Sequence, residues 1–177
     1  MAMTLITTNT FSNAGASNFT SSIDNTYKLY IFKLINIHND TNSRDVKFQG
    51  SIDGGSNYNV TMTTTAFEAN HDEANSSATV SYQGGQDLAQ GTDFQHITDN
   101  QSNDADASSS GTLWLFNPSN TTYVKHWYAI MSAMDTGPGE QAFYSSGYFN
   151  DTNDIDAVSF KPSSGNFDGT IKMYGVG

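Results

Sequence analysis

The sequence predicts an all-β protein: an antiparallel β-sandwich, for which we expect a jelly-roll topology, with an extended N-terminal arm. Three observations indicate this class. Apolar and polar residues alternate in short runs, these runs are rich in Thr, Tyr, Phe and Val, and clusters of Asp, Asn, Gly and Ser separate them. The sequence shows neither a sustained helical period nor an alternation of strands with helices, which disfavours a parallel sheet.

The first 22 residues form a polar leader with isolated apolar positions, among them Phe11 and Phe19. A leader of this composition is ordered only where it docks on something, and a neighbouring subunit is the dock that we expect. We therefore divide the chain into an arm over residues 1–22, which docks on a partner subunit, and a jelly-roll sandwich domain over residues 23–177.

The first strong strand covers residues 27–38 and is apolar on both faces. Such a pattern indicates either a strand deep in the stack of sheets or a strand that contains a bulge. Residues 45–52 then alternate cleanly, and a turn rich in glycine at 53–57 leads into a further strand at 58–67. We expect these two strands to form a hairpin.

Later runs with the composition of strands lie at 79–83, 94–98, 112–117, 122–134, 142–150, 155–161 and 170–175. The best helical candidate is one turn over residues 86–90. Near the end of the chain, a turn that uses Gly165 and Gly169 leads into an alternating run. We expect Ile171 and Met173 to face the core, so that a closing hairpin ends in a buried strand.

The charge and the cysteine content narrow the function further. With 7 basic and 18 acidic residues, the chain has a formal net charge of −11, which opposes binding to nucleic acids and to anionic membranes. Cysteine is absent, which excludes disulfides and thiol chemistry. No apolar run is long enough to span a membrane, and the N-terminus lacks the pattern of a secretory signal. We expect no cofactor, no nucleic-acid partner and no membrane insertion.

Catalytic motifs are weak in this sequence. The run of His, Asp and Glu at 71–73, and Asp93 with His96, could be acid–base pairs or metal ligands, but they lack the spacing of a recognised site. Carboxylates for glycoside hydrolysis could still meet in space among the acidic residues. We predict that the protein is not an enzyme, and a glycan-active hydrolase is the remote alternative.

Oxygen ligands at short spacing occur in two loops. One loop contains Asp99, Asn103, Asp104 and Asp106, and the other contains Asn150, Asp151, Asp154 and Asp156. Such residues suit calcium, but neither loop has the spacing of a calcium-binding hand. An exposed acidic turn is the simpler interpretation, and calcium binding by the first loop stays open.

Residues 125–128 place His126 and Tyr128 on one face of a strand and Trp127 on the other. One face must belong to the core, so the opposite face presents aromatic side chains to solvent or to a partner. Core or subunit interface is the simpler interpretation, and a platform for a glycan is the alternative. The candidate interface or glycan platform is therefore His126, Trp127 and Tyr128, and no catalytic, cofactor or metal residue is assigned.

Six segments, taken in order, resemble a family of tailed-phage virion proteins, largely known from marine phages, that are described as fibre, tail or capsid-associated structural proteins. These segments are residues 22–38, 51–60, 87–95, 115–128, 155–167 and the terminal SGNFDGTIKMYG at 164–175. The resemblance covers nearly everything from residue 20 onward. It implies a β-sandwich displayed on the particle in a homo-oligomer, without enzymatic activity, and it supplies no catalytic residues.

Larger relatives carry such a domain at the end of a long fibre, whereas only residues 1–22 precede it here, too few for a shaft. We therefore expect a capsid decoration or short fibre protein. Its partners would be copies of itself and other proteins of the capsid or tail, and its location would be the virion after synthesis in the host cytoplasm. The alternative is a carbohydrate-binding receptor-recognition module of a tail fibre or tail tip, which would bind a host surface glycan.

Overall fold

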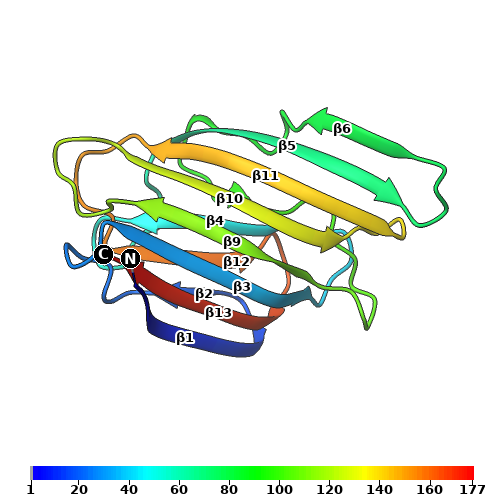
Figure 1. Cartoon of the computed structure of the whole chain (residues 1–177), viewed down its shortest axis with the longest axis horizontal. Coiled ribbons are helices and arrows are strands. Elements are labelled where there is room, and N and C mark those ends of the chain that lie inside the picture. The colour runs from blue at the N-terminus through cyan, green and yellow to red at the C-terminus, as the bar shows by residue number, and fades with distance from the viewer. Residues whose placement is uncertain (1) are drawn as a thin grey trace.

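The computed structural model of the chain describes residues 2–177, and these fold into thirteen β-strands in two antiparallel sheets that pack as a sandwich (Figure 1). The prediction of an all-β sandwich is confirmed, and a jelly roll is compatible with it. Throughout the described residues, no helix is long and apolar enough to cross a membrane. The helical turn expected over residues 86–90 does not form, because residues 89–91 are the short strand β7 (Ala89–Gly91), which pairs with β5.

The larger sheet has nine strands, eight of which follow one another as antiparallel neighbours, with β7 beside them. In spatial order these eight are β1 (Met3–Ala14), β13 (Phe167–Val176), β3 (Leu29–Asn39), β9 (Ser109–Phe116), β10 (Lys125–Met134), β11 (Gly139–Phe149), β5 (Met62–Asp72) and β6 (Ala78–Tyr82). The sheet therefore brings together strands from both ends of the chain.

The smaller sheet has four strands and covers one face of the larger sheet (Figure 1). Its order is β2 (Ser17–Phe19), β12 (Ala157–Pro162), β4 (Val46–Ser51) and β8 (Gln95–His96). The core between the sheets is strongly aromatic. The ring of Phe48 on β4 lies 4.5 Å from that of Trp127 on β10, and 6.2 Å from the rings of Phe149 and Phe160. The contacts of Phe48 with Trp127 and Phe149 are edge-on and join the two sheets.

Strand β3 is bulged, which confirms one of the two interpretations of its apolar sequence; its outer face is not covered by another sheet. Its pairing with β9 slips between Leu34 and Ile37, and Asn36 has a φ of 50° at this point. The extra residue turns Ile37 back towards the core, where both Leu34 and Ile37 are buried, whereas Ile35 is exposed. The bulge thus lets one strand bury apolar residues at even-numbered positions before it and at an odd-numbered position after it.

Both expected hairpins are wrong, because the paired runs belong to different sheets. Strand β4 lies in the smaller sheet and the following β5 in the larger one, and the same holds for β12 and β13. The turn before β13 uses Gly165, with a φ of 75°, to carry the chain across the sandwich. Gly169, with a φ of 147°, lies within β13, where the pairing with β3 slips. The burial of Ile171 and Met173 in the core is confirmed. Alternation identified the buried face correctly but not the neighbouring strand.

The N-terminal leader differs from the separate arm that we expected over residues 1–22, of which Met1 lies outside the described residues. Strand β1 pairs with β13 of the same chain and forms one edge of the larger sheet, while β2 pairs with β12. The rings of Phe11 and Phe167 lie 4.5 Å apart, and Phe19 is buried in the core. The leader is therefore continuous with the sandwich of residues 23–177. Its docking on a partner subunit stays a prediction.

Candidate functional site

The strand that carries the candidate platform separates its side chains between two faces, as predicted. On β10 the odd-numbered residues from 125 to 133 are buried and the even-numbered ones face outward, the period of two that a strand imposes. Trp127 packs edge-on against Phe48 in the core, so it belongs to no surface platform. Tyr128 is 37% exposed, and His126 lies beside Tyr148 with their ring centroids 5.9 Å apart.

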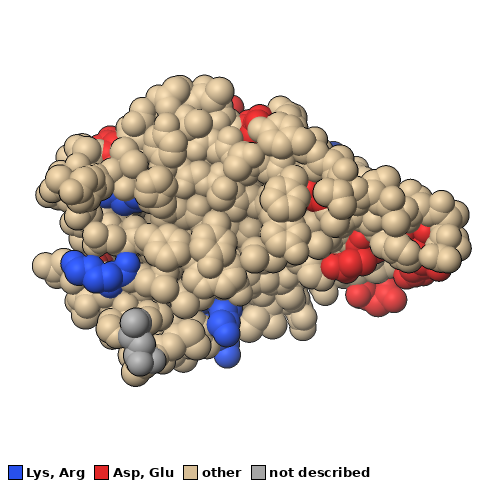
Figure 2. Space-filling model, turned by 45° about the horizontal axis from the view of Figure 1, so that its top comes forward, with Lys and Arg blue, Asp and Glu red and all other residues tan. Residues whose placement is uncertain are grey.

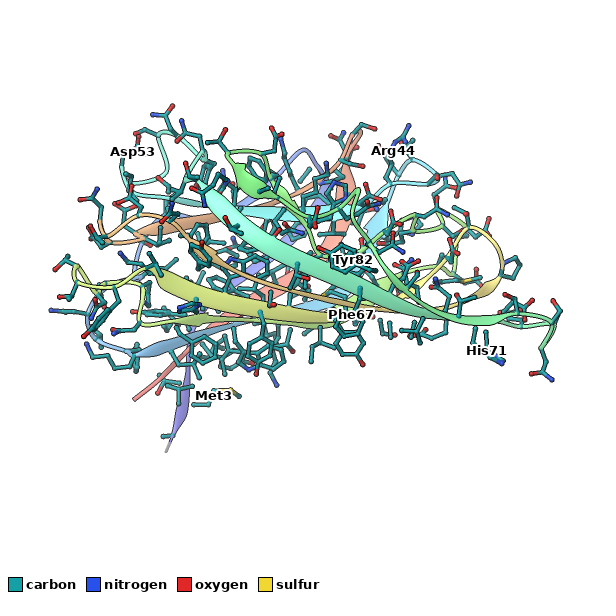
Figure 3. All side chains as sticks on the ribbon, turned by 90° about the horizontal axis from the view of Figure 1, so that it is seen from above. Met3, Arg44, Asp53, Phe67, His71 and Tyr82 are labelled. Atoms are coloured by element: carbon teal, nitrogen blue, oxygen red, sulfur yellow. The ribbon has the colours of Figure 1, made fainter. Side chains whose placement is uncertain are left out.

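The outer face of the larger sheet, on the side away from the smaller sheet, extends this surface across eight strands. Its side chains form rows perpendicular to the strands, and two of these rows define the candidate site. Row 1 runs through Leu5, Tyr174, Ile31, Trp114, Tyr128, Ser146 and Thr65. Row 2 runs through Lys172, Lys33, Thr112, Ile130, Tyr144, Phe67 and Tyr82. Figure 3 shows the sandwich from above, with Phe67 on this outer side and Arg44 and Asp53 on the opposite side.

The aromatic rings of the two rows stack in pairs across neighbouring strands. The centroids of Trp114 and Tyr128 are 4.5 Å apart at an interplanar angle of 22°, and those of Phe67 and Tyr144 are 4.9 Å apart at 4°. Because neighbouring strands are themselves about 4.8 Å apart, and strand side chains stand perpendicular to the sheet, these rings stand upright. They cover each other's faces and present their edges outward. A sugar ring stacks on a free aromatic face, so this arrangement suits a protein surface better.

The outer face is poor in charge although the chain is strongly acidic. Figure 2 shows a broad uncharged surface with charged side chains mostly along its margins. Within rows 1 and 2 the only charged residues are Lys33 and Lys172, against a formal net charge of −11 for the chain. Large apolar side chains on this face are exposed: Leu5, Phe67, Val80, Tyr82, Tyr128 and Ile130. Exposed apolar side chains gathered on one face of a sheet are typical of an interaction site.

A shallow hollow of about 180 Å³ opens in the outer face above β10, β11 and β5. It forms because Ser146 and Thr65, at the far end of row 1, are short, whereas Tyr144 and Phe67 beside them in row 2 are large. Tyr128 bounds it on the third side. The hollow thus exists because short side chains lie next to large ones on this face.

A groove of about 650 Å³ lies at the acidic tip where β5 turns into β6. It contains the run of His, Asp and Glu at 71–73, and two of its acidic residues, Asp72 and Glu140, accept local hydrogen bonds. Backbone amides of Ser76 and Ser77 donate to Asp72, and the hydrogen bonds from Ser76 and Ser77 lower the pKa of its carboxyl group. Glu140 accepts a hydrogen bond of 2.7 Å from Ser132. This geometry is that of a stabilised turn.

His96 lies beside Asp45, with Nδ1 and Oδ2 3.2 Å apart, and it lines a groove of about 480 Å³ together with Asp93. Burial acts to raise the pKa of Asp45, but hydrogen bonds from His96 and from the Asn100 backbone outweigh it, and the pKa is lowered overall. Burial raises the pKa of the neighbouring Asp99. Asp45, just before β4, thereby links His96 and the backbone of Asn100 to the start of that strand.

The acidic loops considered for calcium direct their side chains to separate partners. Asp99 accepts a hydrogen bond of 2.7 Å from Gln86, and Asn103 donates one of 3.2 Å to the carbonyl of Asp40. Asp156 accepts from the backbone of Gly54. Within residues 2–177, no three His, Cys, Asp or Glu side chains come together in a way that could hold a metal ion.

No family model and no curated protein matches the chain. Most of the site also escaped the sequence analysis, which found Tyr128 and His126 but not Trp114, Tyr144 or Phe67. Part of the signal was present in the run 112–117, where Trp114 and Phe116 alternate with Leu113 and Leu115. The function is therefore argued from the outer face itself.

Proposed function

We propose that the protein is a non-enzymatic structural protein of a phage virion, displayed on the particle surface as a capsid decoration or short fibre protein. The upright aromatic outer face carries this proposal. Buried centres of protein interfaces are depleted in charge and enriched in Tyr, Trp and Phe. A face with this composition, on a chain of net charge −11, is a surface that assembly can bury without removing many charges from water.

The six segments that resemble tailed-phage virion proteins supply the setting for this assembly. Two of them form β3 and β13, which lie next to each other in the larger sheet. Another ends in Tyr128, which is part of the outer face. The proposal thus joins a resemblance along the chain with a surface suited to burial against other proteins.

A carbohydrate-binding receptor module is the second candidate, and the hollow in the outer face favours it. Hydroxyl groups of Ser146 and Thr65 lie there between the aromatic side chains of Tyr128 and Tyr144. Hydroxyl groups can hydrogen-bond to a sugar. The upright stacking of the rings is the reason we rank this candidate second.

The virion role can be tested by locating the protein on purified particles of the phage that encodes it. Antibodies raised against the chain, coupled to gold, should label the head surface or short fibres in electron micrographs. Particles made with a Tyr128→Lys variant should lose the label, whereas Tyr123→Lys, a change at a 70% exposed loop residue, should keep it. Unlabelled wild-type particles would contradict a displayed virion protein, and binding of the purified chain to host surface polysaccharide would then favour the receptor module.

A further inference from the structure

We propose that a groove on the smaller sheet binds a phosphate group, carried either by free phosphate or by a small organic phosphate. The groups that would hold it are Lys47 on β4, Lys161 on β12 and Ser163 directly after β12, and we call this site the lysine groove. It lies on the other sheet from the outer face, so the inference goes beyond the proposed function and does not depend on it.

The lysine groove is built on a row of side chains that crosses three strands of the smaller sheet. Lys161 on β12 lies directly opposite Lys47 on β4, and Lys47 lies directly opposite His96 on β8. The neighbouring Phe48 is buried in the core, so this row faces away from the larger sheet. Residues 85–94 supply most of the remaining lining. The groove volume of about 480 Å³ lies within the range of small-molecule sites.

The two lysines face each other without an anion between them. Like charges directly opposite on neighbouring strands destabilise a sheet. Within residues 2–177, no carboxylate oxygen lies within 4.0 Å of the ammonium group of Lys47 or Lys161. Burial lowers the pKa of the Lys47 ammonium group, Lys161 lowers it further, and the opposing effect of Asp45 and Asp93 does not outweigh them. A bound anion would relieve this repulsion.

The lysines of the groove also have hydrogen-bond donors to spare. The buried Lys125 shows how the fold satisfies an ammonium group, since it donates to the carbonyls of Asp151 and Asn153. Lys47 and Lys161 make no such bond in the part of the chain that the structure describes. An ammonium group has three donors and no acceptor, so its complement is a group that only accepts hydrogen bonds.

The other groups in the groove suit a phosphate. The hydroxyl oxygen of Ser163 accepts a hydrogen bond of 3.1 Å from the backbone amide of Asp45, which leaves its own O–H to donate to a ligand. The Nζ atom of Lys161 lies 4.0 Å from the ring centroid of Phe94, a cation–π contact that orients the ammonium group. Lysine binds phosphate as a compact point charge, whereas the planar fork of arginine matches a carboxylate. The donor set therefore favours phosphate over carboxylate.

The carboxylates near the groove restrict the ligand to a small one. Asp45 is engaged by His96, and Asp87 accepts a hydrogen bond from Tyr82. Asp93 is exposed, so solvent and salt screen its charge. A chain with a formal net charge of −11 repels a long polyanion, and a single phosphate group is the anion that fits this setting.

Nuclear magnetic resonance titration of the isotope-labelled full chain tests the site. The probes are inorganic phosphate and glycerol 3-phosphate, and acetate is the carboxylate control. Phosphate should shift the amide signals of residues 85–94 and 161–163 with a dissociation constant of about 1 mM or tighter. Acetate should bind at least tenfold more weakly. Glycerol 3-phosphate should bind more tightly than phosphate if the ligand is an organic phosphate, and no more tightly if it is free phosphate.

Three results of this titration would overturn the proposal. They are the absence of saturable shifts at ten times the expected constant, shifts confined to other parts of the chain, and acetate binding as tight as that of phosphate.

Matched lysine variants separate the groove from general attraction to positive charge. Lys47→Met keeps the apolar stem and removes the charge, so it should weaken phosphate binding about tenfold or more. Lys33→Met is the control, because Lys33 also lies directly opposite a lysine, Lys172, but on the larger sheet. It should bind phosphate as the wild type does. Equal losses in the two variants would contradict a site in the lysine groove.

A pair of glycine variants decides the question without altering a lysine. A Cβ added at Gly85 or at Gly137 meets no atom within 4 Å, but only Gly85 lines the lysine groove. Gly85→Glu places a negative charge at the groove and should weaken phosphate binding at least tenfold, whereas Gly137→Glu should leave it unchanged. If both variants bind phosphate equally well, the lysine groove is not the site.

Discussion

Replacing Ile171 with alanine tests how far the closing strand supports the core. Ile171 lies on β13 between Asn9 of β1 and Leu34 of β3, and its side chain is completely buried. Truncating such a side chain removes apolar contacts and leaves a cavity, which costs about 2–5 kcal/mol of unfolding free energy. Lys172→Ala is the control one residue away, on the opposite face, where a change typically stays within about 0.5 kcal/mol.

Differential scanning calorimetry measures the effect, at one protein concentration because association would itself raise the melting temperature. For a domain of this length, 1 kcal/mol corresponds to about 2–4 °C. Ile171→Ala should therefore melt about 5–15 °C below the wild type, and Ile171→Val should lie between the two. If Ile171→Ala and Lys172→Ala melt at the same temperature, the closing strand does not support the core as argued.

Three further perturbations test other parts of the sandwich. Ending the chain at Gly169 removes most of β13 and leaves β1 without its neighbour, so we expect insoluble or protease-sensitive protein; a cooperative melt would contradict this. Gly111→Val should prevent folding, because any Cβ there meets the carbonyl of Ile130 and the sulfur of Met131; a melting temperature near that of the wild type would refute it. Burial raises the pKa of the Glu68 carboxyl above its usual 4.5, so ionisation of Glu68 destabilises the folded state. Glu68→Gln should exceed the wild type in melting temperature at pH 7, by a margin that closes as the pH falls towards 4.5; a constant margin would exclude this cause.

Local patterning predicted the strands well but not their neighbours. Alternation at Ile171 and Met173 showed which face is buried, since each residue's parity follows from the chain itself. The sheet to which a strand belongs depends on contacts far along the sequence, and this is why both expected hairpins were wrong. The leader was misjudged for a related reason. Strand β1 lies at the edge of its sheet and buries only part of one face. Its sequence therefore lacks the regular alternation of apolar and polar residues that marks a core strand.

The candidate site was predictable in part. Alternation placed Tyr128 and Trp127 on opposite faces but did not show which face is buried, so Trp127, which is buried, was included in the candidate platform. The stacking of Trp114 on Tyr128 depends on the register between β9 and β10, and that of Phe67 on Tyr144 joins strands more than 70 residues apart in the chain. Neighbouring residues in the sequence do not determine these registers, so the stacked pairs of the outer face could be identified only in the folded structure.

The copy number of the chain in gradient-purified particles tests the central claim most directly. Mass spectrometry with isotope-labelled peptides measures this number relative to that of the major capsid protein. A capsid decoration protein should be present at a copy number comparable with that of the capsid protein, and a short fibre protein at a smaller fixed ratio that does not change on further purification. Absence of the chain from infectious, purified particles would contradict the proposal that it is a structural protein of the virion.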